Sequence, residues 1–123
     1  MNWKYIFGSP TYTITFYQDT KKETRWRATH RNGNVIADGG EGYKNAGDAR
    51  TAFTNLAGGV DGDKYQVNIF HDKKKEFRWD IVHINGNVIA DSGEGYKNWI
   101  DAVTALFNLS QALLSGDYRV VES

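Results

Sequence analysis

The sequence predicts an α+β fold of two tandem β-β-β-α(-β) repeats, joined as a pseudo-twofold fused dimer with a shared antiparallel sheet and two helices packed on it. Two observations support this prediction. The segment "NGNVIADGGEGYKN" at residues 32–45 returns almost unchanged as "NGNVIADSGEGYKN" at residues 85–98. The two copies are 53 residues apart. At this offset, residues 12–57 align with residues 65–110 without a gap, and 27 of the 46 pairs are identical. A repeat that occurs only twice is not a solenoid, so we expect the two copies to close one core.

Each repeat begins with two strands whose apolar residues alternate. The segments "YTITFYQ" and "YQVNIFH" place every second residue on one face, and "TRWRATH" and "FRWDIVH" repeat this pattern. We therefore expect Trp26 and Trp79 to face the core. The other residues expected on the inner faces are Tyr12, Ile14, Phe16, Ala28, Tyr65, Val67, Ile69, Phe77 and Ile81.

An Asn-Gly pair, a third strand and a helix complete each repeat. The pairs at residues 32–33 and 85–86 predict tight type I′ hairpins, because both central residues of such a turn need positive φ. The third strand, "NVIAD", leads through a glycine-rich turn to a helix. Asn45 and Asn98 are the candidate N-caps, and an aspartate three residues further on favours the helix N-terminus. After the second helix, "DYRVVE" predicts one more short strand.

These elements divide the chain into an N-terminal extension (residues 1–10), a first repeat (11–59) and a second repeat with a C-terminal strand (60–123), which together form one compact unit. The first repeat has only "AGGVDGDK" between its helix and the next strand, which is too short for a counterpart of "YRVVE". We therefore expect the segment "WKYIF" at residues 3–7 to supply the missing edge strand.

Composition excludes several classes of function. Lys+Arg and Asp+Glu both count 15, so no net charge attracts nucleic acid or anionic membranes over the whole surface. The absence of cysteine excludes disulfides, thiolate metal sites and cysteine nucleophiles. No stretch has the length of a membrane span, and the N-terminus lacks the apolar run of a signal peptide. We expect a cytoplasmic protein without a cofactor.

The segment "FRWDIVHINGNVIADSGEGYKN", followed by an Ala-containing helix, resembles the YegP-like family of small proteins of unknown function. An Arg-Trp strand, an Asn-Gly pair, a short apolar strand and a Glu-Gly-Tyr turn carry the resemblance, and both copies have them. The resemblance implies β-β-β-α-β units that assemble into one sheet with their C-terminal strands exchanged. It implies no established biochemical activity.

The repeated "GEGYK" loops are the first candidate site. Glycine-rich turns before a helix can bind phosphate, yet a glutamate within each loop would repel it and the Walker pattern is absent. A scaffold role is favoured, in which the glycines allow positive φ and the tyrosines anchor the helix. Recognition of a polar small molecule or a peptide stays open, since the scaffold does not require the Glu and Lys residues. The candidate ligand-binding residues are Glu41, Tyr43, Lys44, Glu94, Tyr96 and Lys97.

Single-stranded nucleic acid is an alternative ligand. Basic hairpin tips and strands that interleave arginine with tryptophan can bind a phosphate backbone while aromatic rings stack on bases. The alternation that turns Trp26 and Trp79 inward weakens this hypothesis. The candidate contacts are Lys21, Lys22, Arg25, Arg27, Lys73, Lys74 and Arg78.

Catalysis is disfavoured. His30, His83, Asp38 and Asp91 recur in both copies and could transfer protons. However, the histidines adjoin Asn-Gly turns, where side chains are usually exposed, and no nucleophile triad or glycosidase pair can be placed. The spacing of the three histidines predicts no metal site. We therefore assign no catalytic and no metal-binding residues.

A non-enzymatic binding or interaction module, with a protein or small-molecule ligand, is the favoured function. Its positive support is the second helix, which is more apolar than the first at Trp99, Ile100, Val103 and Phe107. If these residues are exposed together they mark an interface, whereas if the chain's own ends cover them they enlarge the core. We expect a monomer in which the two repeats act as a fused pseudo-dimer, with a homodimer as the alternative.

Overall fold

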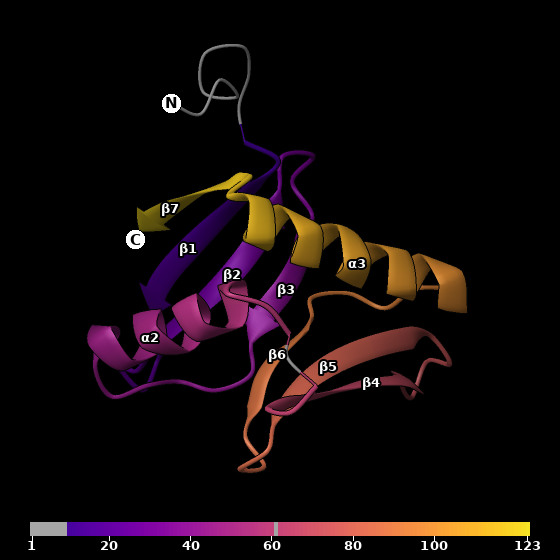
Figure 1. Cartoon of the computed structure of the whole chain (residues 1–123), viewed down its shortest axis with the longest axis horizontal. Helices are drawn as coiled ribbons and strands as arrows, with labels where there is room; N and C mark the ends of the chain where they lie inside the picture. Colours follow the sequence, from indigo (N-terminus) through magenta and orange to yellow (C-terminus); the bar gives the residue numbers. More distant parts are fainter. Residues whose placement is uncertain (1–9, 61) are drawn as a thin grey trace.

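A mainly antiparallel sheet and two helices make up the described part of the chain (Figure 1). The computed structural model describes residues 10–60 and 62–123. The described elements are β1 (Tyr12–Gln18), β2 (Thr24–His30), β3 (Val35–Gly39), α2 (Ala46–Ala57), β4 (Tyr65–His71), β5 (Phe77–His83), β6 (Val88–Ser92), α3 (Trp99–Ser115) and β7 (Tyr118–Glu122). The sheet order is β4-β5-β6-β3-β2-β1-β7. The predicted α+β class and the shared sheet are therefore confirmed.

The two repeats meet at the centre of the sheet, where β3 pairs with β6 antiparallel. Asp38 stands opposite Asp91, its own equivalent 53 residues later, so the pseudo-twofold axis passes between them. On each side the next strands are β2 and β5, then β1 and β4. Strand β7 follows the helix of the second repeat but pairs with β1 of the first, in parallel. This is the exchange of the C-terminal strand that the resemblance implied.

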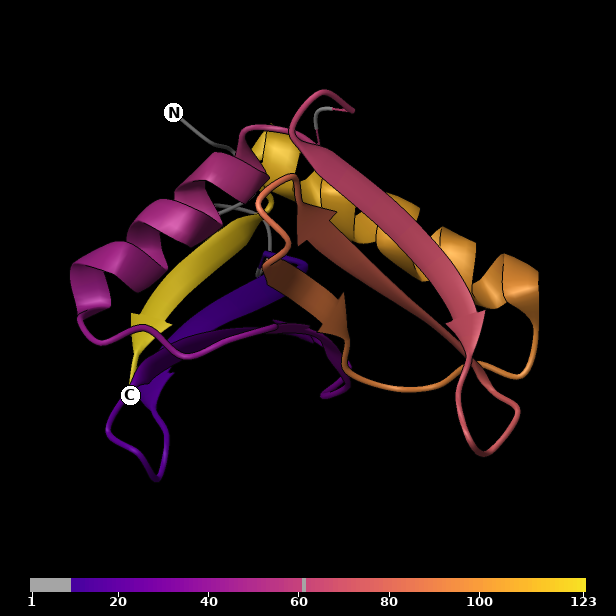
Figure 2. The ribbon, with the colours of Figure 1, turned by 90° about the horizontal axis from the view of Figure 1, so that it is seen from below.

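Both helices lie on the same side of the sheet and cover its apolar face (Figure 2). Tyr12, Ile14 and Phe16 alternate into this core, and Trp26 and Trp79 are fully buried, as the alternation predicted. Phe53 of α2 lies at the centre of an aromatic group, with its ring centroid 5.8 Å from Phe16, 5.3 Å from Trp26 and 5.7 Å from Tyr118. Aromatic side chains bury the largest apolar areas, so this group holds α2 and β7 on the sheet.

The prediction of type I′ turns is wrong. Gly33 has a φ of 97°, whereas Asn32 is not among the described non-glycine residues with positive φ. The carbonyl of His30 accepts from the Gly33 amide (2.8 Å), and the His30 amide donates to the Asn34 carbonyl (2.8 Å). These bonds close a three-residue loop whose last residue is left-handed. The Asn32 side chain supports the loop by accepting from the Asn34 amide (2.9 Å), and the same bonds recur at residues 83–87.

The helix ends follow the capping rules in part. The Asn45 side chain accepts from the amide of Asp48 (2.8 Å), as predicted. Asn98 occupies the equivalent position before α3 but makes no such bond; its Nδ2 donates to the Asp101 carboxylate instead (3.2 Å). Helix α3 ends at Ser115, and the following Gly116, with a left-handed φ of 78°, caps its last turn.

One sequence prediction has no counterpart among the described residues. The edge strand expected at residues 3–7 lies outside the described residues. No helix in the described part of the chain is long and apolar enough to cross a membrane.

Candidate functional site

The two "GEGYK" loops are tied to the sheet by their tyrosine backbones. The amide and carbonyl of Tyr43 bond to those of Thr24, at 2.9 and 2.7 Å. Tyr96 and Phe77 repeat the pair at 2.8 and 2.6 Å. Each loop thus returns to the first residue of the second strand in its own repeat, and this contact fixes where the helix begins.

The glycines that precede these tyrosines serve close packing between the repeats. A Cβ atom on Gly40 would lie 2.2 Å from the carbonyl oxygen of Val88, and one on Gly93 would lie 2.3 Å from that of Val35. Neither glycine has a positive φ. Glycine is needed at both positions, but not for the positive φ that we expected from the sequence: the chain passes too close to the other repeat for a side chain.

Tyr43 and Tyr96 are anchors and not acid–base groups at neutral pH. Both rings pack against the core. Burial, with Glu94 adding to it, raises the pKa of Tyr96 to about 12, and burial also raises the pKa of Tyr43. The Tyr96 hydroxyl has no hydrogen-bond partner among the described residues.

The loop residues do not meet in one site. Each loop follows one strand of the antiparallel β3–β6 pair, so the loops leave from opposite ends of that pair. Glu41 and Glu94 are half-buried, and Lys44 and Lys97 are exposed. Their role in ligand binding stays a prediction.

The recurring histidines have structural roles. His30 Nδ1 accepts from the Asn32 amide (3.1 Å), and the imidazole meets the Tyr12 ring edge-on at 5.3 Å. The second copy repeats both contacts. These contacts hold the hairpin that follows β2 and leave the histidines half-buried rather than exposed.

The candidate nucleic-acid residues divide into free and paired groups. Lys21, Lys22, Lys73 and Lys74 are exposed at the hairpin tips. Arg25 and Arg78, however, are paired through Nε with carboxylates of their own hairpins, Asp19 and Asp72, both at 2.8 Å. Arg27 lies over the Tyr17 ring at 4.1 Å. The Arg25 bond lowers the pKa of Asp19, and the Arg78 bond lowers that of Asp72, so these pairs are charged at neutral pH.

Three aspartates line up across the outer face of the sheet, opposite the helices. The register places Asp80 beside Asp91, Asp91 beside Asp38, and Asp38 beside Arg27. Burial raises the pKa of Asp91 to about 6, with the neighbouring Asp38 as the second cause and Asp80 also contributing. Burial also raises the pKa of Asp38, while the positive charges of Arg27 and Arg25 oppose this shift. This aspartate row can therefore take up a proton near neutral pH.

A hollow of about 320 Å³ lies over one end of the aspartate row. Phe70, Arg78, Asp80 and Asp91 are among the residues that line it. Asp80 is held by the amide of Asn68 (2.9 Å). The hollow offers two carboxylates, a guanidinium and a ring, but no group of described His, Asp and Glu residues is arranged to hold a metal ion. The sequence could not reveal the row, because Asp38 and Asp91 become neighbours only through the β3–β6 pairing.

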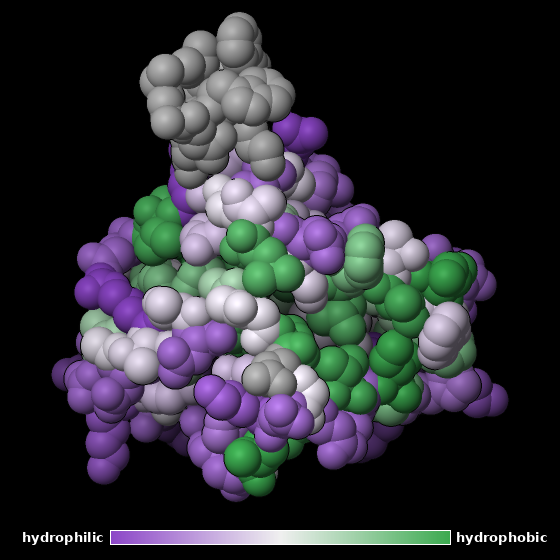
Figure 3. Space-filling view, in the orientation of Figure 1, coloured by the Kyte–Doolittle hydropathy of each residue, from purple (hydrophilic) through white to green (hydrophobic). Residues whose placement is uncertain are grey.

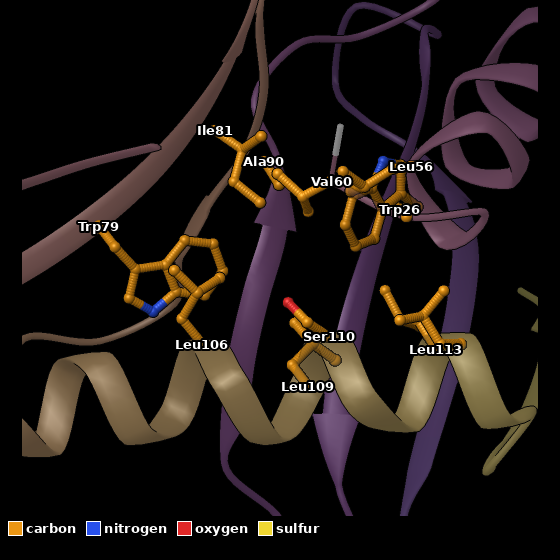
Figure 4. Close-up of a pocket in the computed structure, with 12 residues that line it drawn as sticks. Trp26, Leu56, Val60, Trp79, Ile81, Ala90, Leu106, Leu109, Ser110 and Leu113 are labelled. Carbon is orange, nitrogen blue, oxygen red and sulfur yellow. The ribbon is translucent and has the colours of Figure 1, made fainter. Parts of the chain in front are cut away.

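A second pocket lies under the helices, next to both buried tryptophans (Figure 4). Its walls are almost wholly apolar, and Leu56, Leu109 and Leu113 close it from the helix side. Its volume is about 20 Å³, which has room for about one water molecule and no larger ligand.

The candidate interface residues of α3 are largely exposed. The exposed fractions of Trp99, Ile100 and Phe107 are 53%, 59% and 59%, and Val103 is half-buried. Leu114, at 57%, extends the row, since residues 100, 107 and 114 fall on one side of a helix. Figure 3 shows apolar surface gathered over α3 and toward the β4–β5 hairpin. Within residues 10–60 and 62–123, nothing covers it.

Beside this helix face, no described strand pairs with the outer edge of β4. In the first repeat the equivalent edge, that of β1, is covered by β7. There the Arg50 side chain of α2 pairs with Glu122 of β7, and Tyr118 packs on Phe53. The pseudo-twofold places Val103 at the position of Arg50 and Leu106 at that of Phe53. As a label for the surface formed by the β4 edge and this side of α3 we use the name β4 groove, and we define it by Val67, Ile69, Trp99, Val103 and Leu106.

Comparisons with known proteins agree with this architecture. The profile of a domain of unknown function, DUF1508, matches residues 19–54 and 72–105, which is more than half of the chain. No curated protein matches significantly. The solution NMR structure of yegP from E. coli, a protein of unknown function, superposes with a TM-score of 0.75 at 14% identity, over 93% of this chain and 94% of that chain.

The solution NMR structure of the UPF0339 protein SO3888 from Shewanella oneidensis superposes with a TM-score of 0.72 at 11% identity, over 91% of both chains. At these identities the two structures show a shared fold and nothing about activity. They confirm the resemblance to YegP-like proteins seen in the repeated motif. With both of its repeats matched by the profile, the chain belongs to the DUF1508 family.

Proposed function

We propose that the protein is a non-enzymatic interaction module that binds an extended segment of a protein partner in the β4 groove. The observation that carries the proposal is a difference between the equivalent outer edges of β1 and β4. The β1 edge is completed by β7, whereas no described strand flanks the equivalent edge of β4. A strand edge with exposed apolar residues beside it is a common site for the addition of a partner strand.

The backbone at the β4 edge is oriented for such an addition. In the first repeat, the Phe16 carbonyl accepts from the Ser123 amide on the β7 side (2.9 Å). Ile69 is the equivalent of Phe16, so its carbonyl points to the open edge. Val67, two residues earlier, has the same orientation, and 40% of its side chain is exposed although it lies on the helix side of the sheet.

Nucleic-acid binding has weaker support. Two of the arginines that would contact phosphates, Arg25 and Arg78, are already paired with aspartates. The centre of the outer face carries the aspartate row, which repels a phosphate backbone above pH 6. Of the candidate contacts, Arg27 and the lysines at the two hairpin tips would remain, and those tips belong to separate hairpins.

The test compares proteins retained from host lysate by the immobilised chain and by three variants. Val67→Pro removes an amide from the edge, and Val103→Asp places a charge in the groove. Thr104→Asp is the matched control, because it puts the same charge on the exposed side of α3. We expect one set of partners on the wild type and the control that both groove variants lose. Equal retention by all four proteins would refute the proposal.

A further inference from the structure

The pseudo-twofold defines what the β4 groove can hold. On the β1 side, β7 directs Tyr118, Val120 and Glu122 toward the helix, because these residues stand in register with the inward-facing Tyr12, Ile14 and Phe16. The charge of Glu122 is compensated there, because Arg50 forms an ion pair with it. In the β4 groove the equivalent of Arg50 is Val103. A carboxylate at that point would form no ion pair and would meet the apolar Val103, so an apolar side chain fits this position better than the glutamate of a second β7 strand.

The occupant must therefore carry apolar side chains at alternate positions along its whole length. Within this chain, the segment "WKYIF" at residues 3–7 has that pattern, with Trp3, Tyr5 and Phe7 at every second position. Aromatic residues also have high strand propensity. The segment lies outside the described residues, and it is the longest apolar stretch of the chain that the described elements leave unassigned.

The chain's own segment is too short to reach its own groove. Residues 1–9 join the described chain at Pro10, next to Thr11, which is bound to Asp117 at the β7 side of the sheet. The groove lies six strand spacings from β1, a separation of roughly 29 Å across the sheet. The four residue steps from Phe7 to Thr11 span at most about 14 Å. The segment therefore covers about half of that separation.

We propose that residues 3–7 of one copy bind the β4 groove of a second copy, and that the exchange is reciprocal. This inference rests on the proposed function, because it names the partner of the same groove. Each copy has one such segment and one groove, so a symmetric pair satisfies both. Three aromatic side chains bury about 450 Å² or more, and two segments about 900 Å². With the groove surface added, the interface exceeds the roughly 1,000 Å² of a specific contact.

The first test measures molar mass in solution by light scattering. A single chain has a mass of 13.9 kDa. We expect twice this mass for the full chain at micromolar concentration. Deletion of residues 2–9 and the groove variant Val103→Asp should each halve it, while Thr104→Asp should leave it doubled. A monomeric full chain, or a deletion variant that still dimerises, would overturn the inference.

The absence of cysteine permits a second test that needs no destabilising change. Chains with Lys4→Cys are mixed with chains carrying either Gln66→Cys on β4 or, as the matched control, Arg119→Cys on β7, and a short bismaleimide is added. We expect mixed covalent dimers with Gln66→Cys and few with Arg119→Cys. Equal yields would show that the segment does not choose the groove, and would count against the inference.

The two proposals fail in different ways. A dimer that survives deletion of residues 2–9 but is lost in Val67→Pro and Val103→Asp overturns the exchange of the N-terminal segment and leaves the groove as a binding surface. Retention of every partner by both groove variants refutes the proposed function itself, whatever the mass of the full chain.

Discussion

Replacing Asp91 by asparagine should stabilise the protein at pH 8 and have little effect at pH 4. Burial, followed by the charge of Asp38, raises the pKa of Asp91 to about 6. At pH 8 the side chain is therefore charged in a place that favours its neutral form. Asparagine keeps the size and the polarity of the side chain but removes the charge from the aspartate row.

The size of the effect follows from the difference between the two pKa values of Asp91, 3.8 for an unperturbed side chain and about 6 in the fold. In a site fully shielded from solvent, this difference in pKa corresponds to about 3 kcal/mol in the free energy of unfolding. Asp91 is only half-buried, so solvent screening reduces the expected gain to about 1 kcal/mol. For a domain of this size, that gain raises Tm by about 4 °C.

The direction of the pH dependence follows from proton uptake. The pKa is higher in the folded than in the unfolded protein, so the folded state binds the proton more tightly. The stabilisation by protonation is complete below about pH 3.8 and is lost as the pH rises through about 6. Asp19 and Asp72, whose pKa values are lowered, change stability in the opposite direction, but they contribute equally to the wild type and the variant.

Urea unfolding, followed by tryptophan fluorescence at several values between pH 4 and 8, measures this difference. We expect the gain of Asp91→Asn to appear between pH 4 and 6 and to level off above pH 7. In an Asp38→Asn background the gain should shrink, because the charge of Asp38 is the second cause of the raised pKa. A gain that is the same at pH 4 and pH 8, or a loss at pH 8, would refute the reasoning.

Two further predictions concern stability. Gly40→Ala should destabilise the protein by about 2 kcal/mol or more, because its Cβ would overlap the Val88 carbonyl, whereas Gly62→Ala, with no described atom within 4 Å, should be near neutral in the same thermal melt. Phe53→Ala should cost about 3–5 kcal/mol in urea unfolding, since its ring is buried among three others, whereas Phe107→Ala on the exposed face should change stability by less than about 0.5 kcal/mol. Similar losses in either matched pair would contradict the packing described here.

Local patterns predicted the elements because both repeats give the same local signals. The alternation in "YTITFYQ" coincides with β1, and the buried positions of Ile14 and Phe16 follow from it. The N-cap at Asn45 also depends on residues near in sequence. The predicted turn type at Gly33 was wrong, because a three-residue loop that ends in one left-handed glycine has the same Asn-Gly signature as a two-residue turn.

Features that depend on how the two repeats pack together could not be predicted from the sequence. The position of Asp80 beside Asp91 needs the β5–β6 register, and the meeting of Asp91 with Asp38 needs the central pairing of the sheet. The requirement for glycine at residue 40 arises from the backbone of the other repeat. Likewise, the apolar character of α3 could be read from its residues, but its exposure follows only from the absence of a described strand beside β4.

The comparison of equivalent positions separates scaffold from function. Gly40 and Gly93, which are the same in both repeats, have contacts that explain them within the fold. The repeated loop is in this sense a structural corner that each half requires. The halves differ where Arg50 is replaced by Val103, and where β1 gains a partner strand that β4 lacks. A scaffold explains identity between the repeats but not these differences, which all fall on the β4 groove, and a search for function should therefore begin there.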